Sequence, residues 1–309
     1  MTKSDAASPP RVDQAASIVG IGLAAIGYFV FSLQDATVKW LAVGYPVAQL
    51  MFMRAVVILP FCIVFGGVGV VRRALTSPIR LRLVWRAVVL VTAWTAYYTA
   101  SRDLQLAVLT TIYFSSPLLI AVLAIPFLKE RVTGIRWLSL AVGFTGVVIA
   151  ARPSELGHAS AVGLALLAAA LWAYANILIR QVVQGESTTV VLFASNLTIA
   201  VIGALVMPFV WQPPGAHDLL LMLLVGACGA GGQFLTTEAL RRAAATVIAP
   251  ISFSSLIWAF FLGLAIWGEV PGLTVFVGAA LILLSGAVVA LGEWRGIRRA
   301  PAASAATGD

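Results

Sequence analysis

The sequence predicts an all-α integral membrane protein of ten transmembrane helices, arranged as two five-helix repeats of opposite orientation. Three observations predict this class. The chain is 61% hydrophobic and 10% charged, with a mean hydropathy of +1.00. It contains ten long apolar stretches, and its two halves align with each other. A soluble chain is closer to half apolar and a quarter charged, so these residues cannot cover a water-soluble body of this size.

A helix needs about 20 apolar residues to cross the hydrocarbon core. The first apolar stretch runs on without a small-x-small cleavage site, so we interpret it as a retained helix and not as a signal peptide. The polar residues 1–16 and the Arg-rich, then Ala/Ser-rich residues 293–309 are expected to be disordered cytoplasmic tails. The repeats are expected at 17–151 and 159–292, with spans near 17–38, 46–71, 83–101, 104–128, 134–151, 159–180, 188–210, 218–238, 243–267 and 272–292.

The basic residues predict the orientation. The net charge is +8, and most Lys and Arg, among them Arg72, Arg73, Arg80, Arg82 and Arg86, are assigned to the face that carries both termini. The opposite face carries only Lys39, Arg102 and Arg152. Cytoplasmic loops are enriched in Lys and Arg. We therefore expect a multi-pass protein of a bacterial-type inner (plasma) membrane with both termini in the cytoplasm.

The repeat appears when the sequence is shifted against itself. At an offset of 141, Asp35 aligns with Asn176; at 139, Phe114-Ser115-Ser116 aligns with Phe253-Ser254-Ser255 and Glu130 with Glu269. A unit of five spans is odd, so the second copy begins on the opposite face and is inverted. Inverted repeats of this kind recur in secondary transporters, which alternate access to a site between the halves.

Specific motifs add a family resemblance. The fourth span and its exit, IYFSSPLLIAVLAIPFLKERVTGIRWL, its partner ISFSSLIWAFFLGLAIWGEVPG, and an early MFMRAVV resemble the drug/metabolite transporter superfamily, in its EamA-type ten-helix branch. The resemblance covers about residues 17–292. It implies a central cavity lined by spans 1–4 and 6–9, with spans 5 and 10 more peripheral.

Two ionisable side chains, Asp35 and Arg54, lie inside spans 1 and 2. Charged groups at membrane depth are costly and usually face the bundle interior. Each lies roughly 10 Å from the outer surface at 1.5 Å per residue, so the two can meet. We hypothesise an ion pair or network at a periplasmic gate. The alternatives are a static structural pair, or an Arg54 that snorkels outward.

Aromatic and polar side chains form candidate cavity linings. In span 3, residues at i, i+3, i+4 and i+7 share one helical stripe, and three of them align with polar residues of span 8. Rings with polar tips suit an amphipathic or aromatic solute; anchoring at the headgroup interface is the alternative. The stripe is Trp94, Tyr97, Tyr98 and Ser101, and its span-8 counterparts are Gln233, Thr236 and Thr237.

Further candidates lie beside prolines in spans 4 and 9 and on one face of span 6. Proline frees backbone carbonyls, which are tolerated where protein or a water-filled cavity satisfies them; plain helix packing by small polar residues is the alternative. These candidates are Tyr113, Ser115 and Ser116 in span 4, Ser252, Ser254 and Ser255 in span 9, and Trp172 and Asn176 in span 6.

The sequence carries no motif of covalent or ATP-driven chemistry: HExxH, GxSxG and GxxxxGK[ST] are absent, and His158 and His217 fall in outer loops. We expect no enzyme activity, metal or cofactor, and no nucleic-acid partner. The expected partners are a small-molecule solute and the lipid bilayer; the oligomeric state is open.

The resulting prediction is a secondary, non-ATP transporter of small organic metabolites working by alternating access. Export of amino acids, aromatic ones included, is the preferred solute and direction, because the resembled family includes such exporters and the aromatic stripe suits them. Uptake of a flat vitamin or nucleoside-like metabolite is the alternative. A membrane-embedded enzyme or a non-transporting membrane protein is the alternative of another class.

Overall fold

The computed structural model describes residues 14–116, 118–120, 122–123, 134–151, 159–182, 186–242, 248, 251–285 and 287–288. Within these ranges the regular secondary structure is helical. The expected tails lie outside the described residues except for 14–16, which belong to the first helix. Glu130 also lies outside them.

Within the described residues, the first repeat contains four helices of 18 residues or more and two of eight residues, α3 and α5. The bounds are α1 Gln14–Ala42, α2 Val47–Gly66, α3 Gly69–Thr76, α4 Arg80–Ala100, α5 Leu106–Tyr113 and α7 Gly134–Ala151. The sequence placed residues 46–71 in one span, but α2 ends at Gly66 because Gly67 adopts φ 74°. Helix α3 follows as a separate element with Val70 and Ala74 buried.

The second repeat continues with helices that match the predicted spans in order. They are α8 Ala159–Val182, α9 Thr188–Val210, α10 Ala216–Arg242, α12 Ser254–Trp267 and an apolar helix at Leu273–Ser285. Among the described residues, five helices are individually long and apolar enough to cross a membrane: Ile18–Ala42, Val47–Gly66, Ala159–Leu178, Thr188–Val210 and Ala216–Ala239. The prediction of an all-α membrane fold is confirmed.

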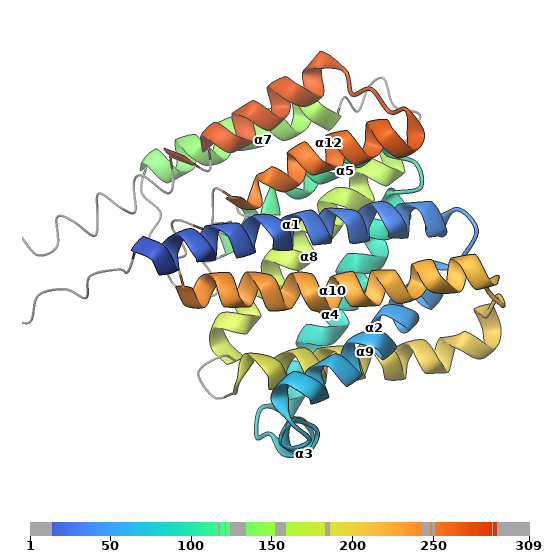
Figure 1. The fold of residues 1–309 in the computed structure, drawn as a ribbon. Coiled ribbons are helices and arrows are strands. Elements are labelled where there is room, and N and C mark those ends of the chain that lie inside the picture. The colour runs from blue at the N-terminus through green and yellow to red at the C-terminus, as the bar shows by residue number, and fades with distance from the viewer. Residues whose placement is uncertain are drawn as a thin grey trace, which may run out of the picture.

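Helix contacts show the inverted repeat directly. Helix α1 packs on α10 and α12, and its repeat counterpart α8 packs on α4 and α5, while α2 packs on α9 and α5 on α12. Exchanging the two repeats therefore reproduces the contacts, as Figure 1 shows for α1 beside α10. At the centre, the aligned residues Phe114 and Phe253 meet with ring centroids 5.2 Å apart.

The helix bundle has two end faces. The near face is the one at which α1 begins, at Gln14, and α10 ends, at Arg242; the far face is where α1 ends, at Ala42, and α10 begins, at Ala216. Helices α2 and α9 are also antiparallel, since Gly66 lies beside Thr189.

The outermost pair of helices lies at one edge of the bundle. In Figure 1, α7 and the red helix at Leu273–Ser285 lie together away from α2, α9 and α10. A Cβ on Gly146 would collide with the carbonyl oxygen of Gly278, so these two helices approach backbone to backbone. The peripheral position that the resemblance implies for spans 5 and 10 agrees with this arrangement.

Candidate functional site

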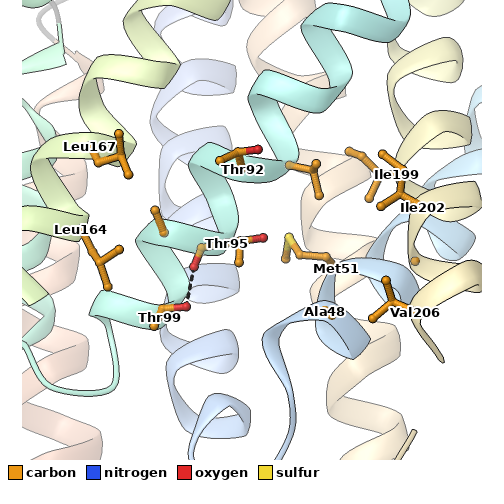
Figure 2. A pocket seen from close by; sticks show the side chains of 13 residues that line it. Ala48, Met51, Thr92, Thr95, Thr99, Leu164, Leu167, Ile199, Ile202 and Val206 are labelled. Carbon is orange, nitrogen blue, oxygen red and sulfur yellow. Dashed lines mark hydrogen bonds between the residues drawn. The ribbon is translucent and has the colours of Figure 1, made fainter. Parts of the chain in front are cut away.

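An apolar groove lies between α2, α4, α8 and α9, toward the far face (Figure 2). Its polar lining residues are three threonines, and the hydroxyls of Thr92 and Thr99 donate to carbonyls one turn back on their own helix. The groove therefore presents mainly hydrocarbon, with threonine hydroxyls as its polar groups. It is suited to apolar chains and is not our candidate site.

The candidate site is a second cavity of about 360 Å³ enclosed by α2, α4, α8, α9 and α10. Ligand cavities are typically about 300–1,000 Å³. Its lining reaches from Arg54 in the middle of α2 to Glu238 and Arg241 at the end of α10. The cavity therefore opens at the near face and ends inside the bundle. The sequence-predicted residues that line it are Arg54, Trp94, Trp172, Asn176, Gln233 and Thr237.

The inner end of this cavity, called the floor below, consists of Arg54, Trp94 and Trp172. The guanidinium carbon of Arg54 lies 4.0 Å from the ring centroid of Trp94, and the two indole rings are 6.3 Å apart. A guanidinium stacked on an indole is held in a fixed plane by the cation–π attraction. The floor thus combines a flat apolar surface with an oriented positive charge.

Arg86 supplies a second positive charge nearer the mouth. It lies about two turns from Trp94 on the same face of α4. Its Nη1 donates to Ser195 Oγ at 3.1 Å, and its Nε donates to the carbonyl oxygen of Ala175 at 3.4 Å. The sequence assigns Arg86 only to the face that carries the termini; in the structure α4 begins at Arg80, so Arg86 lies within this helix and lines the cavity. The spacing Arg86, Leu90, Trp94 at i, i+4, i+8 is the signal that could have located it.

A polar chain beneath the floor joins Arg54 to Asp35. Arg54 Nε donates to Gln34 Oε1 at 3.4 Å, Gln34 Nε2 donates to the Tyr98 hydroxyl at 3.0 Å, and that hydroxyl donates to Asp35 Oδ1 at 3.3 Å. Tyr97 donates to Asp35 Oδ2 at 3.4 Å. The two charged residues are therefore connected through Gln34 and Tyr98 and not by a direct ion pair. Their role as a gate stays a prediction.

The predicted stripe on α4 divides into two parts. Trp94 faces the cavity, whereas Tyr97 and Tyr98, 5% and 2% exposed, lie beyond its floor. Tyr97 packs on Tyr98 at 5.4 Å and on Tyr113 at 4.9 Å, and Tyr113 packs on Trp172 at 6.1 Å between centroids. The side chains of Tyr97 and Tyr98 are therefore packed inside the bundle and do not lie on its outer surface. Together they close the cavity toward the far face.

The remaining predicted residues are not among those that line the cavity. The hydroxyls of Ser101, Thr236 and Ser255 donate to carbonyls within four residues of their own position, as expected of Ser and Thr that pack inside helices. Ser115 and Ser116 are buried next to α5. The repeat-related hydroxyls of Ser115 and Ser254 are buried without a hydrogen-bond partner among the described residues. Ser252 lies before α12, also outside the cavity lining.

Charges at the two ends of the bundle pair differently. At the far face, Lys39 Nζ forms an ion pair with Glu269 and donates to the carbonyl of Leu104 at 2.8 Å, while Glu269 Oε2 accepts from the amide of Leu106 at 2.9 Å. At the near face, Glu238 pairs with Arg241 and Arg242 beside the cavity mouth. The far-face contacts join both repeats and reinforce the closed end.

Sequence reasoning also missed Asn196 and Ser195, which line the cavity from α9. Both lie in an apolar helix that buries Val191, Ile199 and Gly203 on the same side. Two adjacent polar residues inside such a helix are a signal of an internal polar surface.

A one-sided cavity with an oriented charge at its inner end, set between two inverted five-helix repeats, defines a membrane carrier for small solutes. The chain belongs to the EamA-like transporter family, whose pattern matches it twice, over residues 18–152 and 159–291.

Several curated bacterial transporters are similar to the chain over most of its length. The S-adenosylmethionine uptake transporter of Rickettsia conorii is 26% identical over 289 residues, covering 90% of this chain and 96% of the relative. The riboflavin transporter of Rhizobium johnstonii is 27% identical, covering 93% and 96%. The pseudopaline exporter CntI of Pseudomonas aeruginosa is 26% identical, covering 86% and 94%.

A solved crystal structure shares the fold, with a TM-score of 0.62 and 18% identity over 91% of this chain and 98% of the other. Together, the family and its relatives show a multi-pass bacterial membrane protein of the small-metabolite transporter class.

Proposed function

We propose that this transporter carries a small organic metabolite with a planar ring, which rests against the floor of the central cavity. The observation that carries the proposal is the aromatic floor: Trp94 and Trp172 lie 6.3 Å apart at the inner end of a cavity open at one face. Aromatic rings prefer offset or edge-to-face contact at 4.5–7 Å between centroids, worth about 0.5–1.5 kcal/mol per pair. A planar solute gains this contact only when it reaches the floor.

Transport by alternating access follows from the two halves. In this state, the tyrosines beyond the floor and the far-face ion pair of Lys39 and Glu269 close one side. Opening that side while the near face closes requires the two repeats to move against each other. The distribution of Lys and Arg supports a cytoplasmic near face, so the cavity is proposed to face the cytoplasm here. Reporter fusions that place residues 72–82 outside the cell would overturn that orientation.

Two solute classes and directions are candidates. Uptake of a flat, nucleoside-like or vitamin metabolite is supported by the S-adenosylmethionine and riboflavin transporters among the relatives. Export of amino acids, aromatic ones included, is supported by the guanidinium at the floor, which suits a carboxylate, and by an exporter among the relatives. Deleting the gene separates them: loss of uptake makes growth dependent on precursor synthesis, whereas loss of export makes cells sensitive to the solute.

The proposed function is tested by transport into proteoliposomes that contain the full-length protein. Labelled S-adenosylmethionine, riboflavin and tryptophan are the probes. Trp172→Ala is expected to raise KM for the transported probe roughly three- to tenfold, because one aromatic contact is lost. Trp137→Ala is the matched control, since Trp137 is 53% exposed on the peripheral helix α7. Equal KM values for Trp172→Ala and the unaltered protein would refute the stacking site.

A further inference from the structure

The guanidinium of Arg54 is a buried cation whose outer nitrogens are unused. Arg54 is 8% exposed and lines the floor. Of its five N–H donors, the Nε hydrogen reaches Gln34 Oε1 at 3.4 Å. In the described part of the chain, Nη1 and Nη2 form no hydrogen bond and no ion pair. A buried charge without a paired and hydrogen-bonded partner is costly. Nη1 and Nη2 of Arg54 are therefore suited to bind an acceptor that the solute supplies.

Asp35 does not fill that role. Its two carboxylate oxygens accept from Tyr98 and Tyr97, and it is not among the cavity-lining residues. The carboxylate that does line the cavity, Glu238, lies at the mouth and pairs with two neighbouring arginines. Arg86, between mouth and floor, bonds only neutral oxygens among the residues described. Between mouth and floor the charged lining residues are therefore Arg54 and Arg86, while the Asp35 carboxylate lies beneath the floor and interacts electrostatically with Arg54.

We propose that the transported metabolite is an organic acid whose carboxylate binds Nη1 and Nη2 of Arg54 in the cavity. Its planar ring lies against Trp172. Stacking on Trp94 holds the Arg54 fork in plane. Arg54 and Arg86 repel cations and exclude a purely cationic solute. The inference rests on the proposed function and names the solute class for the same cavity.

The test uses pairs of probes that share a ring system and differ in the carboxylate: tryptophan with tryptophanamide, and indole-3-acetate with indole-3-acetamide. Competition with a transported probe in proteoliposomes and ligand-induced melting shifts of the purified full-length protein are the readouts. The acid is expected to bind about 10- to 100-fold more tightly than its amide, the range for a hydrogen-bonded charge pair.

Variants at Arg54 test whether this residue causes the preference for the acid over its amide. Arg54→Gln is expected to remove the preference for the acid, and Arg54→Lys to keep part of it, because Lys retains the charge but not the fork. Arg82→Gln, at an exposed position of α4, is the matched control. Size-exclusion profiles and circular dichroism report folding, and if Arg54→Gln does not fold, Arg54→Lys carries the comparison.

The possible results distinguish failure of the carboxylate site from failure of the proposed transport function. Equal transport of acid and amide, or an acid preference that survives in Arg54→Gln, overturns the anion site and leaves the planar-metabolite transporter standing. Failure of every planar probe, acid and neutral alike, to cross or bind overturns the proposed function itself. Acid preference that disappears in Arg54→Gln supports both.

Discussion

The far-face ion pair between Lys39 and Glu269 ties the two repeats together, and Glu269→Gln is the change that tests its contribution. The side chains are 8% and 15% exposed, so the pair is largely shielded from water. Lys39 also lies 4.9 Å from the ring centroid of Trp267. Glutamine keeps the shape and an oxygen acceptor for the Leu106 amide but leaves the ammonium without its anion.

Removing one member of a buried ion pair typically costs about 3–5 kcal/mol, because the other charge stays buried and uncompensated. We expect Glu269→Gln near the lower end, at about 3 kcal/mol, since the Leu106 amide keeps its acceptor. Glu269→Ala should approach about 5 kcal/mol because it also leaves that N–H unpaired. Combining Lys39→Met with Glu269→Gln removes both charges and should recover most of the loss.

The assay is unfolding of the purified full-length protein by sodium dodecyl sulfate in mixed micelles, followed by circular dichroism. Arg241→Gln is the control: it breaks an ion pair with Glu238 in which the Arg241 side chain is 73% exposed, Glu238 keeps its partner Arg242, and exposed pairs contribute little. The reasoning is refuted if Glu269→Gln is as stable as the unaltered protein, or if the double variant is no more stable than Glu269→Gln alone.

Two further predictions concern packing and the polar chain beneath the floor. A Cβ at Gly226 would lie 2.4 Å from Val57, so Gly226→Ala should destabilise the fold by about 1–3 kcal/mol. A Cβ at Gly231 meets nothing within 4 Å, so Gly231→Ala should be neutral or stabilising in the same titration. Tyr98→Phe deletes a hydroxyl that makes two hydrogen bonds, with Gln34 and Asp35, and should cost about 1–3 kcal/mol of stability. The Tyr113 hydroxyl makes none in the described structure, so Tyr113→Phe should cost less. Equal losses of stability in the two variants would contradict a stabilising role for the hydrogen bonds beneath the floor.

Much of the architecture could be predicted from residue order because it depends on local and repeated properties. Apolar length fixes where helices cross the bilayer, and an odd number of spans per repeat fixes the inversion. Phe114 and Phe253, which the repeat aligns, are in contact in the structure, as expected of symmetry-related residues that lie close to the axis between the two halves. The end of the second span was wrong because Gly67 turns the chain before the apolar run ends.

The site depended on how each helix is rotated and how deeply it is set against its neighbours, which apolar periodicity does not specify. Rotation placed Trp94 in the cavity and Tyr97 and Tyr98 beyond it, although all share one stripe. Depth placed Arg86 inside the bundle. Hydropathy and the repeat thus determined the membrane fold and its two halves by themselves. Only side-chain packing between helices distant in sequence decided that Arg54 lines the cavity and reaches Asp35 through Gln34 and Tyr98, whereas Lys39 pairs directly with Glu269.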